Sequence, residues 1–240
     1  MSGYDAVSFT SEGGQPQNED AVLLIQDDLR LTAILADGLG AYGGGEVASA
    51  EAVNVLFHTL PQPGALNEAA FSACFAAANA AVLARQKPGL NMKSTAVMLV
   101  LEADYAAFAH IGDSRGYAFR EGHLLCQTLD HSVSQMAVFR GDITREQIRF
   151  HRGRSQLLRA LGVEDGLPEE ITELDQPLSG DAFLLCSDGF WEYITEDEME
   201  MNLNKASGAG EWLKLMLARI NKRVPAGHDN LSAIAIICRP

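Results

Sequence analysis

Four short apolar runs follow one another between residues 95 and 127, separated only by short polar breaks. The runs cover residues 95–101, 105–111, 116–119 and 123–127. Parallel neighbours need a crossover of a dozen or more residues, and these breaks are far too short for that. The pattern therefore predicts antiparallel strands, arranged as a meander.

Other strand and helix patterns surround this group. Residues 21–26 and 31–36 flank a turn and predict a hairpin, while 182–186 and 231–238 are almost continuously apolar, as in strands covered on both faces. Helix-spaced apolar residues predict helices near 46–60, 66–82 and 213–220, and Thr144 and Thr195 each open a capping-box pattern. Strands in antiparallel groups with helices between them indicate an α+β fold, which we expect to form one domain over residues 1–240.

Composition excludes several classes of protein. The longest apolar stretches are too short to cross a bilayer, and the first residues carry no export signal. The 4 cysteines are widely separated, so we expect free thiols and a cytoplasmic location. A net charge of −14 argues against a nucleic-acid partner. We expect no membrane contact and a monomer.

Acidic residues stand at the ends of the predicted strands, most of them followed by glycine or a polar turn. These segments are Asn18-Glu19-Asp20, Asp37-Gly38, Gly112-Asp113-Ser114, Ser187-Asp188-Gly189 and Asp229-Asn230. Each alone is an ordinary turn sequence. Strand ends meet at the edge of a sandwich, however, and carboxylates about 4 Å apart repel by on the order of 4 kcal/mol at an effective dielectric near 20. Such a cluster needs protons or hard divalent cations, so we expect Mg²⁺ or Mn²⁺ and not zinc.

In this order the motifs resemble those of the metal-dependent protein phosphatases of the 2C class, in their compact bacterial form. The resemblance also includes Ser94-Thr95, Arg115, Asp130-His131-Ser132 and Leu231-Ser232, and it covers nearly the whole chain. It implies a central antiparallel β-sandwich flanked by α-helices on both sides, in α-β-β-α layers. It also implies hydrolysis of phosphoserine and phosphothreonine in phosphoproteins that an opposing serine/threonine kinase has modified.

The resemblance further implies a role for each acidic motif. Asp37 would bridge two Mn²⁺ or Mg²⁺ ions, Asp188 and Asp229 would complete the first, and the Gly38 carbonyl with Glu19 or Asp20 would hold the second. Asp113 matches the residue associated with a third, weaker ion. Asp37, Asp188 and Asp229 would act in catalysis through a metal-activated water that attacks phosphorus.

The sequence departs from the family pattern where an arginine usually holds the substrate phosphate, because that position is Gln15. Residues 140–159 contain six arginines and lie in the flap segment expected at about 132–160. These arginines predict either a solvated helical face or a positive charge that replaces the missing one. The candidates for contact with the substrate phosphate are Gln15 and Arg154. Lys93, Glu192 and Leu39 replace a glycine, an aspartate and a histidine that are common in the family.

Two other functions fit parts of the sequence. Residues 38–43 match the literal dinucleotide fingerprint, but Asp37 would face the pyrophosphate and no acidic strand end follows about twenty residues later. A catalytically weak or inactive phosphatase-like module that binds phosphoproteins is the alternative that Gln15 supports. The retained carboxylates favour the enzyme.

Overall fold

Two five-stranded antiparallel sheets form the centre of the protein. The computed structural model describes residues 3–39, 43–164 and 168–239. The first sheet has the order β1 (Tyr4–Ser11), β10 (Leu231–Cys238), β9 (Ala182–Cys186), β6 (Arg115–Arg120) and β7 (His123–Gln127). The second has the order β2 (Asp20–Gln26), β3 (Leu31–Asp37), β4 (Ala96–Leu101), β5 (Ala106–Ile111) and β8 (Glu170–Leu174).

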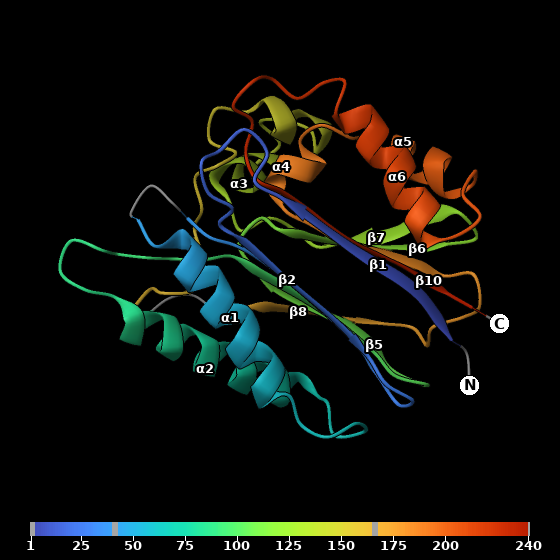
Figure 1. The fold of residues 1–240 in the computed structure, drawn as a ribbon, viewed down its shortest axis with the longest axis horizontal. Coiled ribbons are helices and arrows are strands. Elements are labelled where there is room, and N and C mark those ends of the chain that lie inside the picture. Colours follow the sequence, from blue (N-terminus) through green and yellow to red (C-terminus); the bar gives the residue numbers. More distant parts are fainter. Residues whose placement is uncertain (1–2, 40–42, 165–167, 240) are drawn as a thin grey trace.

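Helices cover the outer face of each sheet, so the α-β-β-α layering is confirmed (Figure 1). The second sheet carries α1 (Gly45–Thr59) and α2 (Glu68–Arg85), and the first carries α5 (Glu196–Leu203) and α6 (Ala209–Ile220). The short helices α3 (Val133–Phe139) and α4 (Asp188–Trp191) and the 3₁₀ helix η2 (Glu146–Phe150) lie near one end of the sandwich. No helix within the described ranges is both long and apolar enough to cross a membrane.

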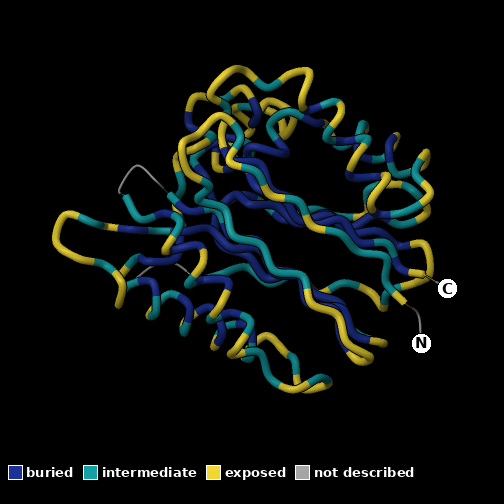
Figure 2. Tube along the Cα trace, viewed as in Figure 1, coloured by how far each residue is buried: buried dark blue, intermediate teal, exposed yellow. Residues whose placement is uncertain are grey.

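Three apolar layers hold these elements together. Leu35, Leu99 and Phe183 pack between the two sheets, while Phe71 and Trp212 belong to the layers beneath the two helical faces. β3, β4 and β5 are therefore buried on both sides (Figure 2), which explains their nearly continuous apolar sequences.

The predicted single meander is wrong in one respect. β4 and β5 pair in the second sheet, whereas β6 and β7 belong to the first, where β6 pairs with β9. The chain changes sheets at Gly112, whose φ of 100° suits glycine, and a Cβ there would lie 2.6 Å from Thr95 Cγ2. The sequence indicated where these strands lie. Which strands pair with one another depends on this turn and on β9.

Several elements differ from the expected set. β1 and β8 were not predicted, because both are edge strands rich in polar residues. The capping box at Thr195 is confirmed at the start of α5. Thr144 precedes only η2, although its N–H donates to Gln147 Oε1 at 2.7 Å.

The dinucleotide-binding interpretation is wrong, because β3 pairs antiparallel with both of its neighbours, while that fingerprint belongs to a parallel βαβ unit. Residues 40–42 of the fingerprint lie outside the described residues.

Candidate functional site

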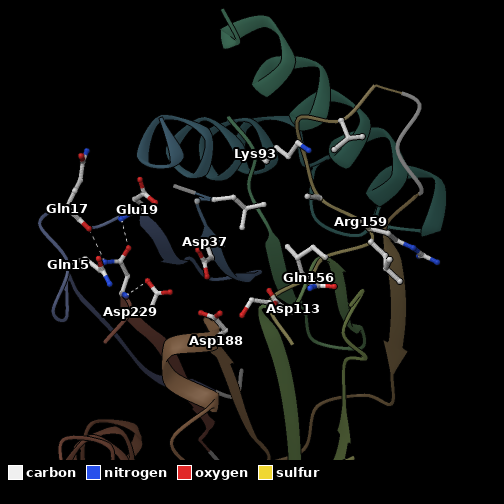
Figure 3. A pocket seen from close by; sticks show the side chains of 18 of the residues that line it. Gln15, Gln17, Glu19, Asp37, Lys93, Asp113, Gln156, Arg159, Asp188 and Asp229 are labelled. Atoms are coloured by element: carbon white, nitrogen blue, oxygen red, sulfur yellow. Dashed lines mark hydrogen bonds between the residues drawn. The ribbon is translucent and has the colours of Figure 1, made fainter. Parts of the chain in front are cut away.

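A cleft of about 940 Å³ opens at one end of the sandwich, where acidic strand ends from both sheets meet (Figure 3). Its lining includes the carboxylate residues Glu19, Asp37, Asp113, Asp188 and Asp229. They lie far apart in the sequence and are brought together by the sheet pairings. Asp20 does not line the cleft but lies next to it.

The strand register places Asp20 and Asp37 at the same level. They are the end pair of the β2–β3 ladder, so their side chains leave the same face of the sheet. The hydroxyl of Ser187 donates to Asp20 Oδ2 at 3.0 Å, which links β2 to the loop that precedes Asp188.

Two glycines allow the backbone to approach this cluster closely. A Cβ at Gly38 would lie 2.1 Å from the carbonyl oxygen of Gly45, the first residue of α1. A Cβ at Gly189 would lie 2.1 Å from the carbonyl oxygen of Asn230. These contacts hold α1 against the end of β3, and α4 against the start of β10.

Buried polar groups fix the backbone around the acids. The hydroxyl of Thr95 accepts a hydrogen bond from the Asp37 N–H at 3.0 Å and pairs with Ser114 Oγ at 2.7 Å. Trp191 Nε1 donates to the Asp113 carbonyl oxygen at 2.9 Å. The Arg115 guanidinium lies 3.6 Å from the centre of the Trp191 ring. The segment that carries Asp113 is therefore held from two sides.

The aspartate side chains of this site lose their protons less easily than free carboxyl groups do. Burial, followed by neighbouring carboxylates, raises the pKa of Asp37 and that of Asp113 well above the usual value. Burial raises the pKa of Asp188 to about 7, with Asp229 adding to the effect. The pKa of Asp20 rises to about 6, again mainly through burial.

The donor set suits hard divalent cations. Oδ1 of Asp20 and Oδ1 of Asp188 are buried without a hydrogen-bond partner, and such atoms are costly unless a proton or cation satisfies them. Every charged acceptor that lines the described cleft is a carboxylate, and no histidine or cysteine lines it. This chemistry fits Mg²⁺ or Mn²⁺.

The two candidate substrate contacts have different surroundings. Gln15 lines the cleft, but its Nε2 donates to the Gly227 carbonyl oxygen at 3.0 Å. Arg154 is not among the lining residues, and its guanidinium pairs with Glu192. Arg149 is buried and donates to the carbonyl oxygens of Trp191 and Ile194 at 3.0 Å, so it supports the α4–α5 region.

Three residues that shape the cleft were assigned no role in it from the sequence. Asn230 accepts a hydrogen bond from the Glu19 N–H at 2.8 Å and donates to the carbonyl oxygens of Glu12 and Gln17, so it holds the loop before β2. Lys93 and Arg159 line the cleft as well. Lys93 could have been found because it replaces a glycine that is common in the family. Nothing in the sequence distinguished Arg159 from the other arginines of residues 140–159.

Comparison with known proteins gives consistent matches. A family model described as protein phosphatase 2C matches residues 11–228. The serine/threonine protein phosphatase PstP of Mycobacterium tuberculosis is 35% identical over 184 residues, which cover 75% of this chain. The aligned part spans only 35% of the length of that relative.

Two further matches cover most of both aligned chains. Serine/threonine phosphatase stp of Listeria innocua is 30% identical over 232 residues, covering 93% of this chain and 88% of that protein. The crystal structure of the PstP catalytic domain in complex with two manganese ions superposes with a TM-score of 0.83 at 28% identity, covering 99% of each chain.

Proposed function

The chain belongs to the protein phosphatase 2C family, and on this premise we propose that it hydrolyses phosphoserine and phosphothreonine in phosphoproteins with two Mn²⁺ or Mg²⁺ ions. The observation that carries the proposal is the cleft with its five carboxylate residues. Oδ1 of Asp188 in the cleft and Oδ1 of Asp20 next to it are buried without a hydrogen-bond partner. The structural match to a relative that contains two manganese ions supports the choice of cofactor.

The proposed metal ligands are those that the family resemblance implies. Asp37 would hold both ions, Asp188 and Asp229 would complete the first site, and the Gly38 carbonyl with Glu19 or Asp20 would complete the second. When bound, the cations neutralise phosphoryl charge and lower the pKa of water so that it can attack phosphorus. Asp113 would serve a third, weaker ion.

The chain's own residues orient this centre. Thr95 fixes the backbone of Asp37, and Asn230 fixes the backbone of Glu19. Burial and neighbouring carboxylates raise the pKa values of Asp37 and Asp188, so a cation that binds there would displace protons and stabilise the ionised carboxylates. Leu39 lines the cleft next to Gly38 and offers no proton to a leaving group.

The alternative function is that of a phosphoprotein-binding module with little catalysis. It is favoured by Gln15, whose amide carries no charge and already donates to the Gly227 carbonyl oxygen. Release of phosphate from a phosphothreonine peptide, measured with and without Mn²⁺, separates the two functions.

We expect Mn²⁺-dependent turnover by the wild type and a loss of roughly 100-fold or more in Asp188→Asn. Asp104→Asn, a change at an exposed loop residue, is the matched control and should keep wild-type turnover. Binding of the phosphopeptide without turnover would favour the module, and Gln15→Arg would then test whether the missing charge is the cause.

The wider biological setting belongs to the same proposal. The substrate is a phosphoprotein and the opposing partner is a serine/threonine kinase. The 4 cysteines are all free thiols, which supports a cytoplasmic location. Residues 1–240 act as one catalytic domain, with residues 132–160 as the flap beside the cleft.

A further inference from the structure

His131 contacts the segments that carry two separate parts of the cleft lining, although it does not line the cleft itself. One part is Asp113, and the other is the run of flap residues 155–160, which we call the flap arm. Figure 3 shows Gln156 and Arg159 of the flap arm on the same side of the cleft as Asp113. A residue that holds both parts therefore determines the shape of this side.

The turn before Asp113 is fixed by His131 through both backbone polar groups of Gly112. The His131 N–H donates to the Gly112 carbonyl oxygen at 2.9 Å, and the Gly112 N–H donates to His131 Nδ1 at 3.2 Å. Both residues are buried. Because a buried N–H that loses its acceptor is costly, the position of Asp113 depends on the His131 ring.

The flap arm is attached to the same residue. The Leu158 N–H donates to the His131 carbonyl oxygen at 2.7 Å, and Ser132 forms a β-bridge with Leu157. Residues 131 and 132 thus join the flap arm along its backbone, next to the ring that holds Gly112.

The His131 ring presents Nδ1 as an acceptor. Burial, followed by His110 and Arg159, lowers the pKa of His131 to about 3, so the ring is neutral near neutral pH. A neutral imidazole carries one proton, and the Gly112 N–H uses the lone pair of Nδ1, which leaves the proton on Nε2. The ring also stacks on His110 with 4.6 Å between the ring centres, which fixes its orientation.

The other edge of the ring contacts the flap arm. Arg159 Nη1 lies 3.3 Å from His131 Nε2 and donates to the Pro168 carbonyl oxygen at 3.0 Å. Glu170 Oε2 lies 3.5 Å from the same Nε2. One ring therefore lies between the Asp113 turn at its Nδ1 edge and the flap arm at its Nε2 edge.

We propose that His131 is a positioning residue whose ring holds Asp113 and the flap arm in the arrangement that a metal ion and a phosphopeptide require. It acts through these segments and not as a proton donor, because no histidine lines the described part of the cleft. The inference rests on the proposed function for the reaction that it serves. The link between the ring, the turn and the arm exists in the metal-free chain and can be measured there.

Three variants separate the ring from the rest of the residue. His131→Leu removes both ring nitrogens, whereas His131→Asn keeps an oxygen near the place of Nδ1 that can accept from the Gly112 N–H. Thr128→Val is the matched control outside the flap arm and the Asp113 turn. The buried Thr128 hydroxyl also accepts a backbone N–H, that of Gly116 at 3.0 Å, so the two apolar variants lose the same kind of bond.

The first measurement is amide hydrogen exchange of the metal-free protein in EDTA. In His131→Leu the amides of Gly112 and Leu158 should exchange about tenfold faster than in wild type, although the substitution keeps the backbone oxygen that Leu158 uses. His131→Asn should restore most of the protection. Thr128→Val should lower the melting temperature to a similar extent but leave both amides at the wild-type rate.

The second measurement is turnover of a phosphothreonine peptide while the Mn²⁺ and peptide concentrations are varied. His131→Leu should need about tenfold more Mn²⁺ for half-maximal turnover and should show a higher KM for the peptide, because both parts of the lining shift together. His131→Asn should recover most of both values, and Thr128→Val should keep them.

Wild-type exchange at Gly112 in His131→Leu, an equal change at this amide in Thr128→Val, or no recovery in His131→Asn would overturn the positioning role. If His131→Leu does not fold, His131→Gln takes its place, because its longer side chain carries the amide away from the Gly112 N–H. Absence of Mn²⁺-dependent turnover in wild type would contradict the proposed function instead, and the exchange rates would still decide on His131.

Discussion

Asp20 and Asp37 face each other directly across the last pair of the β2–β3 ladder. Like charges in this position are destabilising, and Asp20 Oδ1 is buried without a hydrogen-bond partner. Burial and the charge of Asp20 raise the pKa of Asp37 well above the usual value. The fold therefore positions two acids where they are stable only if protons or cations accompany them.

Stability of the metal-free protein should fall as pH rises. The pKa values of Asp20 and Asp188, about 6 and about 7, lie above the unfolded value of 3.8, so the folded chain binds more protons between about pH 4 and pH 7. In EDTA the melting temperature should drop by roughly 5 to 10 °C across this window. Thermal melts at a series of pH values check this, and Mn²⁺ should remove most of the decline. A melting temperature that stays level in EDTA would contradict the prediction.

Replacing one acid by its amide should stabilise the empty site and abolish its response to metal. In Asp188→Asn the uncharged amide relieves repulsion from Asp229, so the protein in EDTA at pH 8 should melt a few degrees above wild type. Addition of Mn²⁺ should then produce little further increase. Asp104→Asn should behave like wild type in both conditions, because Asp104 is exposed in the turn between β4 and β5. An unchanged Mn²⁺ response in Asp188→Asn would remove this residue from the metal centre.

The Thr95 hydroxyl should matter for metal affinity although it does not line the cleft. Thr95→Val keeps the shape but leaves the Asp37 N–H and the Ser114 hydroxyl without their partner, at a cost of about 1 to 3 kcal/mol. We expect Mn²⁺ binding, measured by calorimetry, to weaken by roughly 10-fold. Thr32→Val is the matched control, because Thr32 is buried on the same β3 strand but far from the acids. Equal effects of the two variants on Mn²⁺ affinity would refute a positioning role for Thr95.

Gly38 should tolerate no side chain. Its Cβ would overlap backbone atoms of Gly45 that cannot rotate away, so Gly38→Ala must displace α1 or β3. We expect a loss of about 2 kcal/mol or more in chemical denaturation. Gly210→Ala in α6 meets open space and should be neutral or slightly stabilising, since alanine favours helix. Similar unfolding midpoints for the two alanine variants would show that the contact is not tight.

Local sequence patterns were sufficient for some parts of the structure. The hairpin of β2 and β3 is marked by its turn, and the helix-spaced apolar residues give α2 and α6. The acidic strand ends suggested a shared cleft, because strands of one sandwich end at common edges. These features depend on periodicity and turn chemistry, which neighbouring residues determine.

Other parts depend on contacts between distant segments. The change of sheets at Gly112 depends on β6 finding β9, whose residues lie far ahead in the chain. The Gln15 amide is tied to Gly227 by a contact across 212 positions. Arg154 and Arg159 look equivalent in the sequence. In the structure Arg154 pairs with Glu192, whereas Arg159 lies beside the bridge between Ser94 and Leu161.

The proposed function requires that acids distant in the sequence bind two divalent cations together. Anomalous diffraction from crystals grown with Mn²⁺ tests it directly, because manganese is located without reference to any assumed ligand. We expect two strong peaks, both beside Asp37, with Asp188 and Asp229 at one and the Gly38 carbonyl at the other. A map without manganese between these residues, obtained at a saturating concentration, would contradict it.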